Sequence, residues 1–135
     1  IQQSDRILII GPDPKAKGGM LSVIAFLAPM YTPVHLVVTY KEYQKLVSTF
    51  VCDLVLKTFY YCVFRQIDVI HIHTANYIDF YRNSVLIYIG KLFNKRVLLH
   101  IHGSLFNEFY NTHPALWHRC VGQLMFGNSV IYFCK

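Results

Sequence analysis

Short apolar runs alternate with longer apolar segments along the chain, and this alternation predicts the order of its secondary structure. Five runs are short, continuous and mostly apolar, as expected of strands that are buried on both faces. They cover residues 6–11, 34–39, 68–73, 96–102 and 130–134. The longer segments between them predict helices, several of which end at Pro, Gly or Asn. These helices cover residues 20–28, 43–65, 80–93 and 114–126.

The regular succession of strand and helix predicts an α/β fold. Parallel strands need crossover connections, so this order builds a Rossmann-like, doubly wound parallel sheet with helices on both faces. A chain of 135 residues has the length of one such domain. In open sheets of this kind, ligands bind at the carboxyl ends of the strands. We therefore expect the functional residues directly after the strands.

The composition predicts that part of the apolar surface of the domain is buried against something else. Hydrophobic residues make up 54% of the chain and charged residues only 15%, so another domain, a partner or a membrane is expected to cover part of it. The chain begins at Ile1 and ends on a strand, which predicts a piece cut from a longer protein. The aromatic residues of segment 43–65 are predicted to be core, with contact to a membrane or a lipid-linked acceptor as the alternative. They are Phe50, Phe59, Tyr60, Tyr61 and Phe64.

The charge of the chain indicates which partners to expect, and its cysteines indicate its location. Thirteen Lys and Arg against seven Asp and Glu give a net charge of +6, which favours nucleotide phosphates or acidic lipid headgroups as partners. No dense run of Lys and Arg supports nucleic-acid binding. Asp53 and Lys57 interrupt the longest apolar segment, which argues against a membrane span. Four cysteines without paired spacing predict reduced thiols in a cytoplasmic protein, with peripheral contact to the inner face of the membrane as an option.

The first candidate site is the loop G-P-D-P-K-A-K-G-G at residues 11–19, between the first strand and the first helix. Gly18 and Gly19 let the backbone approach a ligand, and the N–H groups of Gly19 and Met20 point out of the positive end of the helix. Lys17 adds positive charge, so a phosphate or a polar sugar fits the loop. A tight helix-entry turn explains the glycines equally well. The loop matches neither the dinucleotide fingerprint nor the phosphate loop of ATPases.

The second candidate site consists of two H-x-H pairs, His71 with His73 and His100 with His102. Within each pair the side chains share one face of a strand. We expect the inner residues His71 and His100 to be hydrogen-bonded core residues. We expect the outer residues His73 and His102 to face the ligand crevice, where a donor or general base is useful. Imidazoles also bind zinc, but nothing in the sequence fixes a carboxylate beside them, so no metal is expected.

These features occur in an order that resembles the N-terminal domain of glycosyltransferase family 4. The resemblance is carried by residues 6–11, by the G-G-M at 18–20, by D-V-I-H-I-H-T at 68–74 and by L-H-I-H-G at 99–103. It covers nearly the whole chain. It implies the N-terminal half of a GT-B architecture, in which two Rossmann-like domains face each other across a cleft. Such enzymes transfer a sugar from a nucleotide-sugar donor, usually with retention of configuration, and generally need no metal or other cofactor.

The resemblance also implies roles for individual residues. His102 is similar to the histidine that approaches the transferred sugar, and it is the expected catalytic residue. The donor phosphates and the acceptor are expected to contact Lys17, Gly18, Gly19 and Met20. The acceptor or sugar site is expected to be lined by His73, Thr74, Asn76, Gly103 and Ser104.

One part of the family pattern is missing from the chain. The paired glutamates that bind the donor belong to the second domain of the family, and only Glu42 and Glu108 occur here. Residues 1–135 are therefore expected to form the acceptor-side half, inactive without its C-terminal donor-binding domain. A glycan or a lipid-linked molecule is the expected acceptor. The alternatives are a stand-alone module that binds a nucleotide or sugar without catalysis, and a metal-dependent hydrolase built on the histidines.

Overall fold

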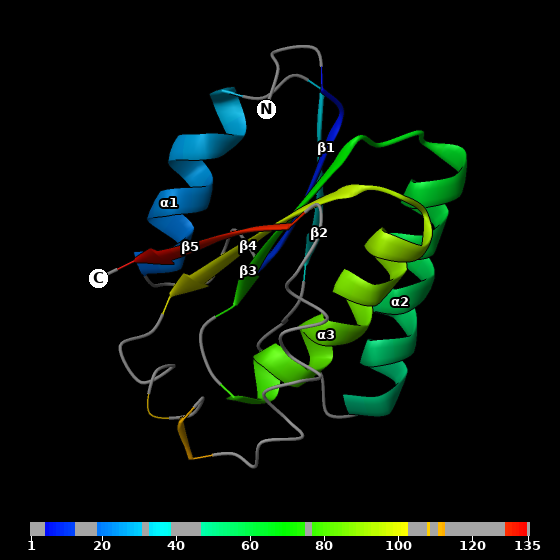
Figure 1. The fold of residues 1–135 in the computed structure, drawn as a ribbon. Helices are drawn as coiled ribbons and strands as arrows, with labels where there is room; N and C mark the ends of the chain where they lie inside the picture. The colour runs from blue at the N-terminus through cyan, green and yellow to red at the C-terminus, as the bar shows by residue number, and fades with distance from the viewer. Residues whose placement is uncertain are drawn as a thin grey trace.

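A computed structural model of the chain describes residues 5–12, 19–30, 33–38, 47–74, 77–102, 108, 111–112 and 129–134. The elements it defines are β1 (Ile7–Gly11), α1 (Gly19–Leu27), η1 (Ala28–Met30), β2 (Val34–Val38), α2 (Val47–Phe64), β3 (Val69–Thr74), α3 (Tyr77–Leu92), β4 (Arg96–His102) and β5 (Ser129–Cys134). The strands pair in parallel in one sheet, in the order β2-β1-β3-β4-β5 (Figure 1). The predicted Rossmann-like α/β sheet is thereby confirmed.

The order of the strands creates a switch point between β1 and β3. From β1 the chain crosses to β2 on one side, and it then returns to form β3 on the other side of β1. In open parallel sheets, ligands bind outside the carboxyl ends of the strands at such a reversal. The ends of β1 and β3 are therefore where a ligand is expected, with β4 next to them.

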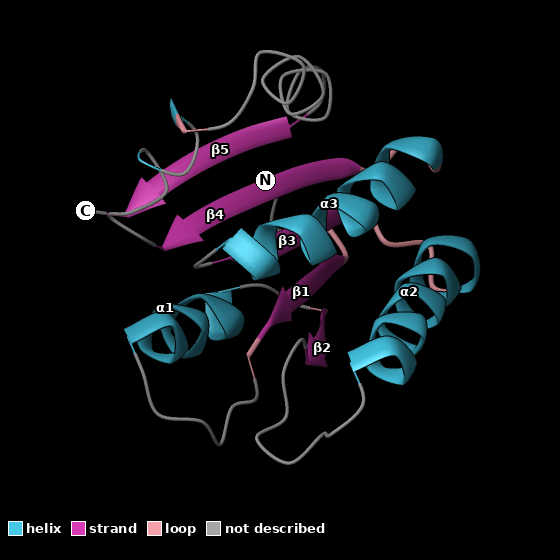
Figure 2. Cartoon of the chain, turned by 90° about the horizontal axis from the view of Figure 1, so that it is seen from below, coloured by secondary structure: helices cyan, strands magenta, loops and turns pink. Residues whose placement is uncertain are grey.

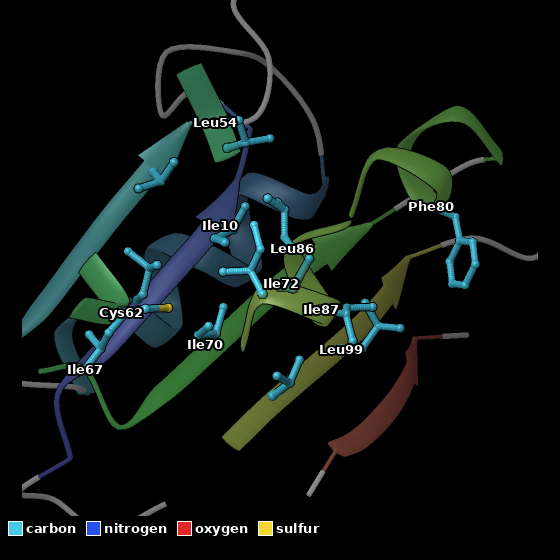
Figure 3. Packing of buried hydrophobic residues seen from close by; sticks show 14 of the residues in the cluster. Ile10, Leu54, Cys62, Ile67, Ile70, Ile72, Phe80, Leu86, Ile87 and Leu99 are labelled. Carbon is cyan, nitrogen blue, oxygen red and sulfur yellow. The ribbon is translucent and has the colours of Figure 1, made fainter. Parts of the chain in front are cut away.

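Helices cover both faces of the sheet, with α1 on one face and α2 and α3 on the other (Figure 2). Every residue of β1 and of β3 is buried, as strands covered on both faces must be. The larger core lies between the sheet and α2 and α3 (Figure 3), and its fully buried members include Ile10, Leu54, Ile70, Ile72, Leu86 and Leu99. The smaller core lies on the α1 face and contains Ile7, Ile9, Ile24 and Val69.

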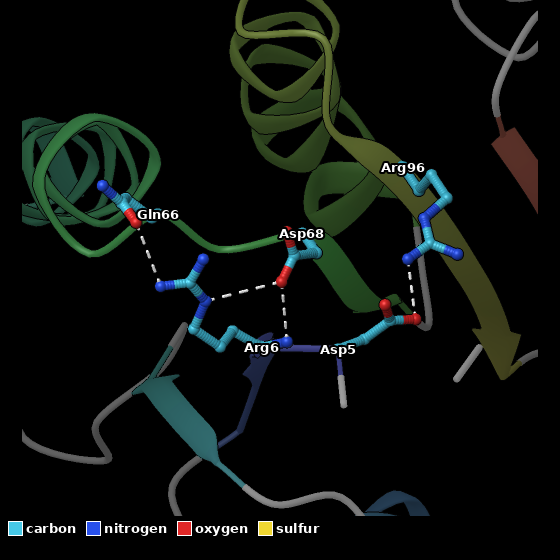
Figure 4. A network of polar contacts seen from close by, with 5 residues as sticks. All are labelled: Asp5, Arg6, Gln66, Asp68 and Arg96. Atoms are coloured by element: carbon cyan, nitrogen blue, oxygen red, sulfur yellow. Dashed lines mark hydrogen bonds and ion pairs between the residues drawn. The ribbon is translucent and has the colours of Figure 1, made fainter. Parts of the chain in front are cut away.

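Polar contacts tie the amino ends of the central strands together (Figure 4). The backbone N–H of Arg6 donates to the carboxylate of Asp68 at 2.9 Å, and the Arg6 guanidinium lies 3.5 Å from the same oxygen. Asp5 pairs with Arg96 at 2.6 Å, which links the start of β1 to the start of β4. These contacts lie at the amino ends of the strands, and the expected ligand site lies at their carboxyl ends. We therefore assign these contacts to strand register and not to the chemistry of the site.

The predicted elements agree closely with the described ones. Each predicted strand matches an observed strand to within a residue at either end, and the helices predicted at residues 20–28, 43–65 and 80–93 correspond to α1, α2 and α3. The helix predicted at residues 114–126 lies outside the described residues. Among the described residues, no helix combines the length and the apolar character needed to cross a membrane.

The prediction that the aromatic residues of α2 are core is wrong for three of them. Phe59, Tyr60 and Phe64 are exposed by 45%, 48% and 67%, whereas Tyr61 packs against the larger core. The physical reason is that α2 is apolar around most of its circumference but packs only one side against α3 and the sheet. The side chain of Phe50 lies outside the described part of the chain.

Candidate functional site

Four histidines, His71, His73, His100 and His102, gather on β3 and β4, and we call them the histidine cluster. Each strand contributes two of them at alternate positions, so the side chains leave the sheet on one face. The residues between them belong to the larger core under α2 and α3. The histidine cluster therefore lies on the face where α1 packs, near the carboxyl ends of the strands.

Burial divides the histidine cluster by strand. His71 and His73 on β3 are almost fully buried, with 2% and 1% of their surface exposed, whereas His100 and His102 on β4 are half-buried. The sequence suggested a different division, with His71 and His100 inside and His73 and His102 at the crevice. The packing of α1 explains the difference, because Ile24 of α1 packs with residues of β1 and β3 and lies at Gly11 next to His73.

The four rings contact one another across the two strands. The rings of His71 and His100 are nearly parallel, at 3°, with centroids 5.8 Å apart, and those of His100 and His102 are 4.1 Å apart. Nδ1 of His73 lies 2.9 Å from Nε2 of His102, which is hydrogen-bond distance. Only one of these two nitrogens can donate the proton, so the tautomers of the two rings are coupled.

Several polar atoms at this site lack partners among the described residues. They are both ring nitrogens of His71 and Nε2 of His73, and Oγ1 of Thr74 on the opposite face of β3 also lacks a described partner. A buried polar group without a partner costs free energy, roughly 1–3 kcal/mol. Within the described part of the chain, His71 is therefore not the satisfied core histidine that its inner position suggested. Groups of this kind mark a place where a ligand or ion can supply the missing contacts.

Burial keeps the histidine cluster uncharged near neutral pH. It lowers the pKa of His71 to about 4, of His73 to about 2 and of His102 to about 4, and repulsion from neighbouring imidazoles of the cluster adds to each shift. Burial also lowers the pKa of His100. Neutral imidazoles retain a lone pair on one ring nitrogen, so they can accept hydrogen bonds or bind metal ions.

Gly11 connects the histidine cluster with α1. A Cβ atom added to Gly11 would lie 3.8 Å from Cβ of His73 and only 2.5 Å from Cδ1 of Ile24 on α1. The missing side chain thus lets α1 pack close to the end of β1. Helix α1 begins at Gly19, as the loop motif predicted, and the first N–H groups of a helix have no partners within it.

Some of the remaining predicted site residues lie in the described part of the chain, and others lie outside it. Thr74 is buried, and by strand alternation its side chain lies on the opposite face from His73. Met20 lies in the first turn of α1. The predicted site residues outside the described part of the chain are Lys17, Gly18, Asn76, Gly103 and Ser104.

A polar group on α3 supports the end of β3, and sequence reasoning missed it. The side-chain amide of Asn83, which is fully buried, donates to the backbone oxygen of His73 at 3.3 Å. Arg82 donates to the amide oxygen of Asn83 at 3.3 Å and pairs with Asp79 at 2.9 Å. Burial lowers the pKa of Arg82, and Asp79 opposes that shift. The only signal in the sequence was a run of polar residues at the start of an otherwise apolar helix.

Comparison with known proteins identifies no relative of this chain. No protein-family model matches the chain, and no curated protein or solved structure matches it. The described residues define a Rossmann-like α/β domain with a histidine cluster near the carboxyl edge of its sheet. Any assignment of function therefore rests on that geometry and on the sequence motifs.

Proposed function

We propose that this chain is the acceptor-side, N-terminal domain of a GT-B glycosyltransferase similar to family 4. It acts on a nucleotide-sugar donor and on a glycan or lipid-linked acceptor. The observation that carries the proposal is the 2.9 Å contact between His73 and His102, next to the strand end at Gly11. Three of the four parts of the family-like motif thus lie near the switch point of the sheet, where ligands bind in this class of fold.

In this proposal His102 positions the donor sugar through a hydrogen bond. Its Nε2 is engaged by His73, which leaves Nδ1 for a hydroxyl of the sugar. A pKa of about 4 makes His102 a weak base near neutral pH, so we assign it a positioning and hydrogen-bonding role in direct contact with substrate. Holding two reactants in the correct geometry is a large source of rate enhancement.

The start of α1 supplies the second component of the proposed mechanism. The N–H groups of Gly19 and Met20 belong to the first turn of a nine-residue helix. Free N–H groups at this end favour negative charge. They would stabilise the diphosphate leaving group as its charge develops, in the manner of an oxyanion hole. The loop glycine Gly18 allows the phosphates to approach the backbone.

The exposed side of α2 supports a membrane-linked acceptor. Phe59, Tyr60 and Phe64 are exposed, and we call them the α2 aromatic patch. Arg65 is exposed at the end of the same helix, and the chain carries a net charge of +6. Aromatic side chains combined with positive charge favour an anionic membrane surface. A membrane surface is where a lipid-linked acceptor would be held.

Sugar transfer by the protein as its gene encodes it tests the proposal. Labelled nucleotide-sugars of several bases are incubated with lipid-linked and polysaccharide acceptors, and the label in the acceptor is measured. We expect transfer from one class of donor. A donor that binds stoichiometrically but is never consumed would instead support the stand-alone binding module. Absence of both binding and transfer across the panel would reject the glycosyltransferase assignment.

A further inference from the structure

Three members of the histidine cluster are arranged as ligands of one ion. His71, His73 and His100 each offer a ring nitrogen, and the three nitrogens lie within 4.8 Å of one another. Zinc bound tetrahedrally at roughly 2.0–2.1 Å needs nitrogens roughly 3.4 Å apart. Rotation of the side chains on a fixed sheet can close that difference. Three histidines also form a known zinc-binding donor set in catalytic sites.

The unpartnered atoms are those that a metal ion would use. His71 has no hydrogen-bond partner on either ring nitrogen, and His73 has none on Nε2, within the described part of the chain. Both side chains are at least 98% buried, so water reaches them poorly. A buried imidazole without partners is costly, and coordination of an ion removes that cost.

His102 is placed to orient His73 for coordination. When Nδ1 of His73 donates its proton to Nε2 of His102, 2.9 Å away, the lone pair of His73 is on Nε2. Nε2 is the nitrogen of His73 that lacks a partner. Histidines that bind metals almost always donate their other N–H to a neighbouring acceptor, which fixes the tautomer and the ring orientation.

The surroundings of the cluster also suit a transition-metal cation. Among the described residues, Ile9 of β1 is the register partner of His71, and Ile24 of α1 lies at Gly11 next to His73, so both neighbours are apolar. Imidazole nitrogen without carboxylate favours zinc-like transition ions over calcium or magnesium.

We propose that His71, His73 and His100 form a binding site for a divalent transition-metal ion of the zinc type, with His102 as the residue that orients His73. Three protein ligands leave one position of a tetrahedral ion for water or a substrate oxygen. The proposal departs from the metal-free chemistry that the family resemblance implies. It rests on the geometry of the cluster and does not depend on sugar transfer.

Metal titration of the chelator-treated 135-residue chain tests this site. Co²⁺ is added and followed by its visible absorption, and Zn²⁺ is then used to displace it. We expect one ion per chain. The variant His100→Gln removes a half-buried ligand and should lower the affinity for Zn²⁺ at least about a hundredfold. The variant His102→Gln removes the residue that orients His73 and should lower the affinity about tenfold to a hundredfold. The matched control His35→Gln, on β2 away from the cluster, should bind as the unaltered chain does.

Two outcomes would overturn the proposal. One is a folded wild-type chain that binds neither Co²⁺ nor Zn²⁺ stoichiometrically, and the other is a His100→Gln variant that binds with wild-type affinity. If the variants do not fold, ¹⁵N NMR of the histidine rings in the wild-type chain decides the matter. Zn²⁺ must then shift the signals of His71, His73 and His100. Shifts confined to His35, His113 and His118 would place the ion elsewhere and reject the site.

Discussion

At the scale of single residues, the neutral charge of the histidine cluster decides what chemistry is available to it. Imidazoles that burial holds uncharged can share a proton, as His73 and His102 do over 2.9 Å, or bind an ion. They cannot all be charged at once, because His71 and His73 have almost no contact with water. The cluster therefore makes folding stability depend on pH.

We predict that the metal-free chain loses stability as the pH falls below about 6.5. The folded pKa of His71 is about 4, below its ordinary value of 6.5, so the unfolded state binds more protons between these values and protonation favours unfolding. The groups that face His71 are His73, His100 and His102. For this ring the loss from pH 6.5 to pH 5 is about 1.5 kcal/mol.

Urea unfolding at a series of pH values measures this loss. The variant His71→Gln removes the titrating group, and its free energy of unfolding should fall less steeply with acid than that of the wild-type chain. The other titrating groups are present in both proteins, so their contributions cancel in the comparison. Parallel pH profiles for the two proteins would show that His71 is not held neutral in the folded chain.

At the scale of elements, α2 is the helix whose apolar composition differs most from its exposed position at the surface. Its apolar residues suit a helix buried on all sides, yet Leu56 and Phe64 are each 67% exposed. Helix α3 shows a milder form of the same feature, with Tyr88 exposed by 60%. A soluble surface rarely carries a contiguous apolar area of this kind unless something covers it.

Binding to anionic liposomes tests what covers α2. We predict that the wild-type chain is retained on phosphatidylglycerol vesicles and that retention falls several-fold when Phe59, Tyr60 and Phe64 are all changed to Gln, because buried apolar area drives interfacial binding. The matched control Phe26→Gln alters a 70% exposed aromatic residue on α1, on the other face of the sheet, and should leave retention unchanged. Equal retention of all three proteins would contradict a role for the α2 aromatic patch.

The elements themselves were largely predictable from the sequence, and the surroundings of the site were not. Continuous apolar runs such as residues 6–11 predict buried strands, since a strand covered on both faces is apolar at every position and the run is too short for a helix. The period of two placed His71 and His73 on one face correctly. Which histidines are buried depends on where α1 packs on the sheet, a non-local property. The contact of Asn83 with His73 likewise joins two elements and leaves no local signal.

At the scale of the whole molecule, the sheet order explains why these residues meet. The winding reversal between β1 and β3 brings Gly11 next to His73, and the pairing of β3 with β4 brings His102 beside His73. The polar contacts of Arg6 and Asp68 hold the opposite edge. The polar contacts that join the strands thus lie at their amino ends. The histidine cluster lies near their carboxyl ends, where ligands bind in open α/β sheets.

The central claim is that His102 acts directly on the substrate of a sugar-transfer reaction. Its most direct test is the turnover number of the encoded protein, measured with saturating donor and acceptor, for His102→Ala and for the control His35→Gln. We predict a fall of roughly a hundredfold or more for His102→Ala, because a positioned hydrogen-bonding group is lost, and little change for the control. Wild-type turnover in a folded His102→Ala protein would remove His102 from the site and contradict the account.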